Sequence, residues 1–266
     1  MEAQETGVIL SVNNRKLWEK GNVMVENRIK YLSWVEFDKR RKETSLVILP
    51  SGAIEVYGPH LPLGSDILVA QKISELVAER VNAIVGPCVE IGDSGALSSF
   101  PGTLVMNPDN LKAAYRDICM SFIKWGFKSI LFLNTHLGNI APLNQLGEEL
   151  QTNQGIKCGT VAWWQFLPSV SEGILETKAP HGHASEAGTS VLSYLFPEYV
   201  DMNLAAEVEP TYKDDYKDIF KYLPFTAYTP NGIIGDARAG SAEKGERLVE
   251  RAVDRIVHFV KDVLLK

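Results

Sequence analysis

Short runs of apolar residues alternate along the chain with longer segments in which apolar residues recur every three or four positions. The short runs are typical of buried strands, and the longer spacing is typical of helices with one buried face. The runs predict strands at residues 45–50, 83–85, 129–133 and 157–163. The periodic segments predict helices at 66–82, 107–125, 184–196 and 242–264, with Ser65 as the N-cap of the first and a further helix beginning at Asn139.

Strands and helices that alternate in this way favour an α/β fold, in which helices cover both faces of a mostly parallel sheet. Residues 200–233 lack a clear periodicity, and we interpret them as an insertion or an edge of the same domain. Since no linker is visible, residues 1–266 are predicted to form a single domain, with 1–30 as an N-terminal extension or edge segment. Ligands bind at the carboxyl ends of the strands in such sheets, so we expect functional residues after Pro50, Leu133 and Trp163.

The composition is that of an ordinary globular protein. Of the 266 residues, 45% are hydrophobic and 23% are charged, which is enough for a substantial core. The 27 Lys and Arg residues against 33 Asp and Glu residues leave a net charge of −6. This acidic balance argues against nucleic acid and anionic membranes as partners.

The three cysteines fit neither a metal knuckle nor a disulfide framework, so we expect Cys88, Cys119 and Cys158 to be free thiols in a reducing compartment. The first ten residues contain two glutamates and no basic stretch, unlike a secretory signal. No apolar run is long enough to span a membrane. Together these features predict a cytoplasmic protein.

Polar residues that can carry chemistry gather in three loops. In chain order the loops contain Glu55, Tyr57, His60 and Asp66, then His136, and finally His181, His183 and Glu186. They hold four of the five histidines of the chain. If the loops converge at one edge of the sheet, their carboxylates and imidazoles are the ligand types of Zn, Mn or Fe(II).

Each of these residues also has an ordinary structural explanation. Glu55 can be a solvated residue, Asp66 can stabilise the first turn of its helix through the helix dipole, and Glu186 can cap a helix. His136 can be a hydrogen-bonded structural histidine. All of these explanations would have to hold at the same edge of one sheet, so the combination favours a metal site.

Several segments resemble the motifs of one known family. Residues 55–66 resemble E-x-H-G-P-H-L-P-L-G-x-D, 100–103 read F-P-G-T, 134–139 resemble N-G-H-G-G-N, and 183–190 resemble H-A-G-E-x-E-T-S. Residues 235–236 and 241–245 are similar to a late G-D-P and A-x-x-G segment. These motifs belong to the creatininase family, and the resemblance runs from about Tyr31 to the end of the chain.

The resemblance implies a three-layer α/β/α sandwich, commonly assembled as a hexamer. It also implies a hydrolase that uses two divalent ions to open cyclic amides or to cleave formamide-type C–N bonds. By motif position it implies four metal ligands: Glu55, Asp66, His136 and Glu186. Asp66 would bridge the two ions, and His183 would act as an acid and base. Trp163 and Trp164 would wall the substrate pocket, and we add His60 as a substrate-binding residue.

Three parts of the motifs depart from the family pattern. Tyr57 stands where the family has a histidine ligand of the second ion, and a phenol is a poor metal ligand at neutral pH because its ordinary pKa is about 10. Gly188 replaces the second Glu of H-A-G-E-x-E-T-S, and residues 97–99 lack a Glu-His pair. We therefore expect a changed substrate or a single ion, and we assign to Tyr57 a catalytic hydrogen bond to the developing oxyanion.

These observations predict a metal-dependent hydrolase that holds one or two ions of Zn or Mn, or of Fe, per chain. It would open a small polar cyclic amide or cleave a related non-peptide C–N bond, and it would form a homo-oligomer. One alternative is ring-opening of a cyclic ketone or lactone such as an oxidised inositol, and another is a family member without catalytic activity. Nucleotide-binding and serine-hydrolase classes are disfavoured, because the chain has no G-x-G-x-x-G after a strand, no P-loop motif and no G-x-S-x-G.

Overall fold

The computed structural model describes residues 18–19, 22–23, 25–212, 215–216, 218–219 and 221–266, so most of the predicted N-terminal extension lies outside the described residues.

Four parallel strands form the central sheet. The strands are β3 (Leu46–Ser51), β4 (Ile84–Val85), β5 (Ser129–Asn134) and β6 (Lys157–Ala162), in the spatial order β4-β3-β5-β6. All neighbouring pairs in this sheet are parallel, which confirms the predicted α/β class.

Continuous burial explains why β3 and β5 appear in the sequence as unbroken apolar runs. Every residue of both strands is buried. A parallel strand that is covered on both faces has no side that favours polar residues. Ser51 pairs with Asn134 in the register of the two strands. The loop after β3 and the loop after β5 therefore begin next to each other, at the carboxyl ends of the strands.

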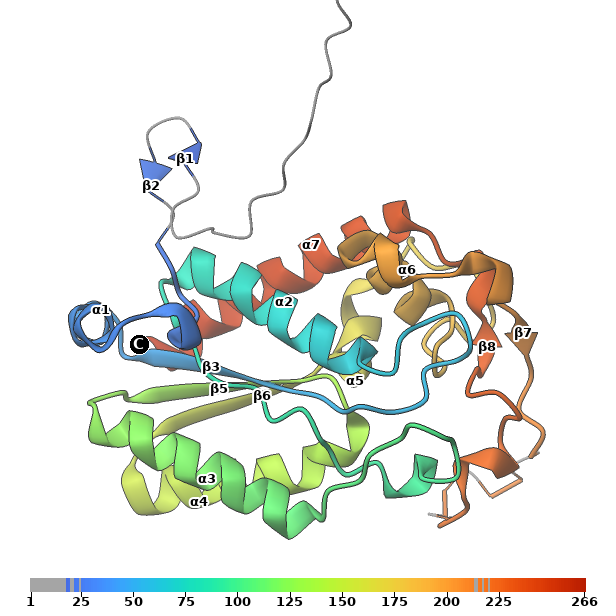
Figure 1. Cartoon of the computed structure of the whole chain (residues 1–266), viewed down its shortest axis with the longest axis horizontal. Helices are drawn as coiled ribbons and strands as arrows, with labels where there is room; N and C mark the ends of the chain where they lie inside the picture. Colours follow the sequence, from blue (N-terminus) through green and yellow to red (C-terminus); the bar gives the residue numbers. More distant parts are fainter. Residues whose placement is uncertain (1–17, 20–21, 24, 213–214, 217, 220) are drawn as a thin grey trace, which may run out of the picture.

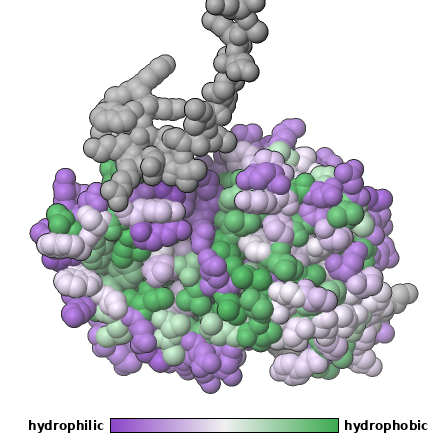
Figure 2. Space-filling view, in the orientation of Figure 1, coloured by the Kyte–Doolittle hydropathy of each residue, from purple (hydrophilic) through white to green (hydrophobic). Residues whose placement is uncertain are grey.

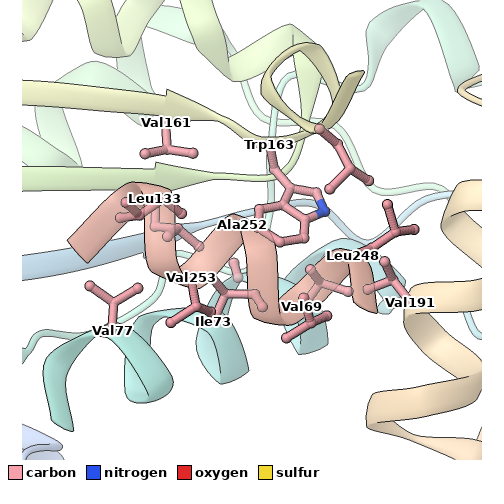
Figure 3. Close-up of a cluster of buried hydrophobic side chains, with 14 of the residues drawn as sticks. Val69, Ile73, Val77, Leu133, Val161, Trp163, Val191, Leu248, Ala252 and Val253 are labelled. Atoms are coloured by element: carbon pink, nitrogen blue, oxygen red, sulfur yellow. The ribbon is translucent and has the colours of Figure 1, made fainter. Parts of the chain in front are cut away.

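Helices cover both faces of the sheet (Figure 1). On one face lie α2 (Ser65–Val81), α6 (Glu186–Leu195) and α7 (Ala242–Phe259), and on the other lie α3 (Pro108–Lys124) and α4 (Ile140–Gln154). Each face has its own cluster of buried apolar side chains. Figure 3 shows the first cluster, in which Trp163 lies beside Leu248 and Ala252 of α7. The predicted three-layer arrangement is confirmed.

Shorter elements connect these layers. They are α1 (Trp34–Arg40), α5 (Trp163–Phe166), the strand pairs β1 (Trp18–Glu19) with β2 (Asn22–Val23) and β7 (Glu207–Val208) with β8 (Gly235–Asp236), and 3-10 turns at Ile29–Tyr31, Gly95–Leu97, Leu137–Asn139, Leu167–Val170, Pro197–Tyr199, Met202–Leu204, Phe225–Ala227 and Ala237–Ala239. The described part of the N-terminal segment lies along β4, because the backbone N–H of Val85 donates to the carbonyl of Asn27 (2.8 Å).

The helix ends differ from the prediction in two informative ways. Gly64, not Ser65, is the N-cap of α2; Ser65 is the first helical residue, and its hydroxyl donates to the carbonyl of Pro62 (2.7 Å). The α-helix of α7 ends at Phe259, and Val260–Leu264 continue as a π-helical turn.

The three cysteines are free, as predicted. Of the helices in the described residues, none combines the length and hydrophobicity that crossing a membrane requires.

The loop that follows β3 is held against the chain that follows β4. The backbone N–H of Leu104 donates to the carbonyl of Ile54 (2.9 Å), and the side chain of Leu63 fills the space beside Gly102. Leu63, Leu104 and Val105 remain exposed. Figure 2 shows hydrophobic residues across the middle of the face in view, with hydrophilic residues towards its margins.

Close packing of α6 and α7 depends on a glycine. A Cβ atom at Gly245 would overlap the carbonyl oxygen of Ser190 in α6. We expect Gly245→Ala to lower the free energy of unfolding by about 1–3 kcal/mol, because overpacking forces the two helices apart. Urea denaturation monitored by circular dichroism measures this change.

Gly147→Ala in α4 is the matched control. A Cβ atom there would meet only the Cβ of Cys158, at 3.6 Å, which is an ordinary contact. Alanine is the better helix former by about 1 kcal/mol, so this variant should be as stable as the wild type or more stable. Equal stability of the two variants would contradict the close-packing explanation.

Candidate metal centre

Two carboxylates and one imidazole meet at the carboxyl ends of the strands. Glu55 follows β3, Asp66 lies in the first turn of α2, and His136 follows β5. Nδ1 of His136 lies 3.0 Å from Oε2 of Glu55 and 3.4 Å from Oδ2 of Asp66. One ligand atom from each residue lies within 4.8 Å of the others, and all three side chains are buried. The structure therefore brings together three of the four predicted metal ligands.

Hydrogen bonds from the turn after β5 fix the position of this cluster. The Asn134 side chain donates to the carbonyl of His136 (2.7 Å) and accepts from its backbone N–H (3.2 Å). The Thr135 hydroxyl donates to the carbonyl of Asp66 (2.8 Å), which ties the start of α2 to this turn. Gly138 allows the loop that contains Asp93 to approach this turn, because a Cβ atom at Gly138 would overlap the carbonyl oxygen of Asp93.

The orientation of His136 suits a metal ligand. Its Nε2 lies 2.8 Å from the backbone carbonyl of Asp93, which can only accept a hydrogen bond, so Nε2–H is the donor. In the neutral ring Nδ1 would present its lone pair to an ion between the two carboxylates, and without an ion a proton on Nδ1 takes that place. A backbone carbonyl that holds the remote ring nitrogen in this way is the usual support of a histidine ligand.

The donor set fits a divalent cation. Two carboxylate oxygens and an imidazole lone pair are all acceptors, and buried acceptors that face one another need a positive charge between them. Separations of 3.0 and 3.4 Å are close to those between ligand atoms that share an ion at roughly 2.0–2.2 Å. Nitrogen and oxygen donors of this kind suit Zn or Mn.

The pKa values show how strongly these groups interact. Burial opposes the charge of Glu55, but hydrogen bonds from His136 and His183 lower the pKa of Glu55 to about 2. Burial raises the pKa of Asp66 to about 6 although His136 opposes this shift. Burial would lower the pKa of His136, but Asp66 and Glu55 raise it well above the ordinary value. The cluster therefore stabilises positive charge between its carboxylates.

Ser94 is a neighbour of the cluster that the sequence did not reveal. Its hydroxyl donates to Oε2 of Glu55 (2.7 Å) and lies 3.3 Å from Nε2 of His136. The side chain is fully buried. The only signal in the sequence was a Gly-Asp-Ser stretch at 92–94 in a polar loop, which is too common to single out without the fold.

A cavity of about 260 Å³ opens beside the cluster. Besides the three cluster residues, its lining is formed by Tyr57, Asp93, Ala96, Leu97, Thr135, Leu137, Gly138, Trp164, His181, Gly182, His183 and Phe225. The cavity therefore includes Tyr57, His183 and Trp164 of the predicted site residues. Residues that follow each of the four strands contribute to it, as the convergence of the loops at this sheet edge predicts.

Tyr57 lies deep in this cavity wall, with its side chain between two other rings. Its ring centroid is 6.0 Å from that of Trp164 and 4.8 Å from that of His183. Burial, together with the charges of Asp66 and Glu55, raises the pKa of Tyr57 well above its ordinary value, so the phenol keeps its proton. A Cβ atom at Gly188 would lie 3.2 Å from the phenol oxygen. The missing side chain at Gly188 thus makes room for Tyr57.

His183 presents one ring nitrogen to the cluster. Its Nδ1 lies 2.6 Å from the carbonyl of Gly232 and must donate to it, which leaves Nε2 3.5 Å from Oε1 of Glu55. The next residue, Ala184, has a φ of +49°, which a residue with a Cβ atom rarely adopts. The backbone is strained where it aims this imidazole, as is common at functional sites.

The two tryptophans separate in the structure. Trp164 lines the cavity and donates from Nε1 to Oδ1 of Asp66 (3.1 Å). Trp163 lies in the hydrophobic cluster between the sheet and α7, and it does not line the cavity (Figure 3). His60 is also outside the cavity lining: it is buried, its Nε2 lies 2.8 Å from the hydroxyl of Thr189, and burial lowers its pKa to about 4.

Glu186 is not brought to the cluster. Its carboxylate accepts hydrogen bonds from the backbone N–H groups of Glu176 (3.1 Å) and Thr177 (2.9 Å). It also forms an ion pair with Nζ of Lys244, from α7, at 2.6 Å. Glu186 is completely buried, and these bonds lower its pKa although burial opposes the shift. In this arrangement Glu186 joins α6 to α7.

The ion pair between Glu186 and Lys244 should contribute to the stability of the fold. Lys244→Met should destabilise the fold by on the order of 3 kcal/mol, because it leaves the Glu186 carboxylate buried without its counter-charge. Urea denaturation measures the change. The double variant Lys244→Met/Glu186→Gln carries no unpaired charge and should recover part of the loss; if it unfolds as early as the single variant, the ion pair does not explain the effect.

A family model described as creatininase, creatinine amidohydrolase, matches residues 30–260. The chain belongs to the creatininase family of hydrolases. The creatinine amidohydrolase of Pseudomonas putida is 28% identical to it over 250 residues, which cover 87% of this chain and 95% of the relative. The mycofactocin precursor peptide peptidase of Mycolicibacterium smegmatis is 30% identical over 235 residues, covering 82% and 86%. The 3-dehydro-scyllo-inosose hydrolase of Thermotoga maritima is 25% identical over 253 residues, covering 85% and 80%.

Solved creatininase structures share the fold. A tryptophan-to-phenylalanine variant of creatininase matches with a TM-score of 0.76 at 25% identity, over 90% of this chain and 98% of its own. A manganese form and a Zn-Zn form match with TM-scores of 0.76 and 0.77 at 24% identity, each over 90% of this chain and 98% of its own. The predicted family is confirmed, while the relatives differ in the substrates that their names give.

Proposed function

We propose that this protein is a metal-dependent hydrolase that opens a small cyclic amide or cleaves a related non-peptide C–N bond. The observation that carries the proposal is the buried group of Glu55, Asp66 and His136, whose three ligand atoms converge beside a cavity. The Pseudomonas putida relative, named as an amidohydrolase, supports the choice of bond.

Glu55, Asp66 and His136 would hold the ion, and Zn or Mn suits their donor atoms. A divalent ion bound there supplies Lewis-acid chemistry, which polarises a carbonyl and lowers the pKa of a water molecule. Ser94 keeps Glu55 in position through its hydrogen bond to Oε2. The carbonyl of Asp93 keeps the Nε2 proton of His136 away from the ion, so that Nδ1 is the ligand atom.

The other cavity residues would move the proton and bind the oxygen. Nδ1 of His183 is committed to the carbonyl of Gly232, so Nε2 is the atom that can take a proton from water and return it to the leaving group. Tyr57 keeps its proton and can donate a hydrogen bond to the oxygen that gains charge. Trp164 and Phe225 contribute apolar walls that exclude water.

The same geometry supports one ion per chain. The Tyr57 ring occupies the space over Gly188, next to Asp66 and Glu55. Glu186, the fourth predicted ligand, is neutralised by Lys244. No second group of three ligand atoms is present among the described residues. A homo-oligomeric, cytoplasmic enzyme remains a prediction from the sequence.

Metal analysis tests the centre directly. Protein purified without chelator should contain about one equivalent of Zn or Mn per chain, and His136→Ala should retain almost none and lose turnover. Elemental analysis measures both. His258→Ala, at an exposed position in α7, is the matched control and should keep its metal. A wild-type protein that takes up no ion even after reconstitution would instead support a family member without catalytic activity.

Ring-opening of a cyclic ketone or lactone is the second candidate, and the Thermotoga maritima relative, named as an inosose hydrolase, favours it. Assays of creatinine-like lactams against cyclic diketones and lactones of similar size separate the two. We expect turnover of the lactams, because His183 is placed to protonate a leaving nitrogen. Activity confined to the ketones or lactones would replace the first proposal with the second.

A further inference from the structure

The charges that line the cavity are one-sided. The acidic residues of the lining are Glu55, Asp66 and Asp93, and the lining contains neither lysine nor arginine. Lys244 does not offset them, because it is paired with Glu186 and Glu176 outside this lining. An anionic group that entered the part of this cavity away from the ion would lose hydration without meeting a cationic side chain, which is unfavourable.

Asp93 is the carboxylate that a bound ion would not neutralise. A divalent ion held by Glu55 and Asp66 balances their two negative charges, whereas Asp93 contributes only its backbone carbonyl to the support of His136. Among the described residues, none donates a hydrogen bond to the Asp93 carboxylate or forms an ion pair with it. The cavity around a loaded centre thus keeps one unmatched negative charge.

The rest of the lining suits a ligand with an apolar body and a hydrogen-bond acceptor such as a carbonyl oxygen. Leu97, Leu137, Trp164 and Phe225 supply apolar contacts. Tyr57 lines the cavity and is 3% exposed as a residue, and its phenol makes no hydrogen bond to another described residue. A donor beside a cavity that has no protein partner is free to bond an acceptor on the ligand.

We propose that Asp93 is a specificity-determining residue that selects substrates carrying a positively charged group, such as an amidinium or an ammonium, and disfavours anionic ones. This inference rests on the proposed function of the same cavity. The apolar walls would hold the body of the substrate, Tyr57 its carbonyl oxygen, and Asp93 its cationic nitrogen. A charge-assisted hydrogen bond to a carboxylate is stronger than a neutral one, so Asp93 would contribute measurably to binding.

Three probes of one shape and different charge test the proposal: benzamidinium, benzamide and benzoate. Isothermal titration calorimetry of the metal-loaded protein should show benzamidinium binding more tightly than benzamide. Asp93→Asn keeps the size of the side chain and removes its charge. It should weaken benzamidinium by about tenfold, change benzamide by less than about twofold and strengthen benzoate.

Asp117→Asn is the matched control, because it removes the same charge from an exposed position in α3 and should leave all three affinities unchanged. A ratio of benzamidinium to benzamide affinity that Asp93→Asn leaves unchanged would overturn the proposal, as would failure of benzamidinium to bind the wild type. Benzoate can bind the ion itself, so its affinity is compared only between variants. Failure of the proposed function would appear separately, as absence of metal or of turnover while the charge preference persists.

Discussion

Buried hydrogen-bond acceptors that face one another are stable only with a positive charge between them, and the centre of this protein is built on that constraint. The carbonyl of Asp93 holds one ring nitrogen of His136 and thereby turns the other towards Glu55 and Asp66. Neighbouring backbone and side-chain contacts hold these three residues together. The parallel register of β3 and β5 brings the two loops together, and Thr135 ties the start of α2 to them.

The layers of the fold follow from the hydrophobic pattern because burial is what that pattern records. β3 and β5 are covered on both faces and so appear as continuous apolar runs, and α7 has one buried stripe that the spacing of its apolar residues predicts. Helix ends were less predictable, because they depend on single local bonds. The Ser65 hydroxyl bonds to a preceding carbonyl and does not cap its helix.

The candidate site could be predicted only as far as its residues follow strands or match motifs. Glu55, Asp66 and His136 were found in this way. Glu186 matched a motif equally well, but its surroundings depend on Lys244, which lies far along the chain in α7 and contacts it only after α6 and α7 have packed. Ser94 and Asp93 were missed because their roles arise from an unremarkable loop that the fold places against His136. For the adjacent Trp163 and Trp164, the sequence does not say which side chain faces the core.

The contact between Tyr57 and Gly188 links two positions that are far apart in the sequence. A larger side chain at position 188 is compatible only with a smaller one at position 57, and a tyrosine at position 57 is compatible only with a very small residue at position 188. The two positions are therefore expected to change together among related sequences. An evolutionary route between the two arrangements would have to pass first through a small residue at both positions, which leaves a temporary void and not a clash.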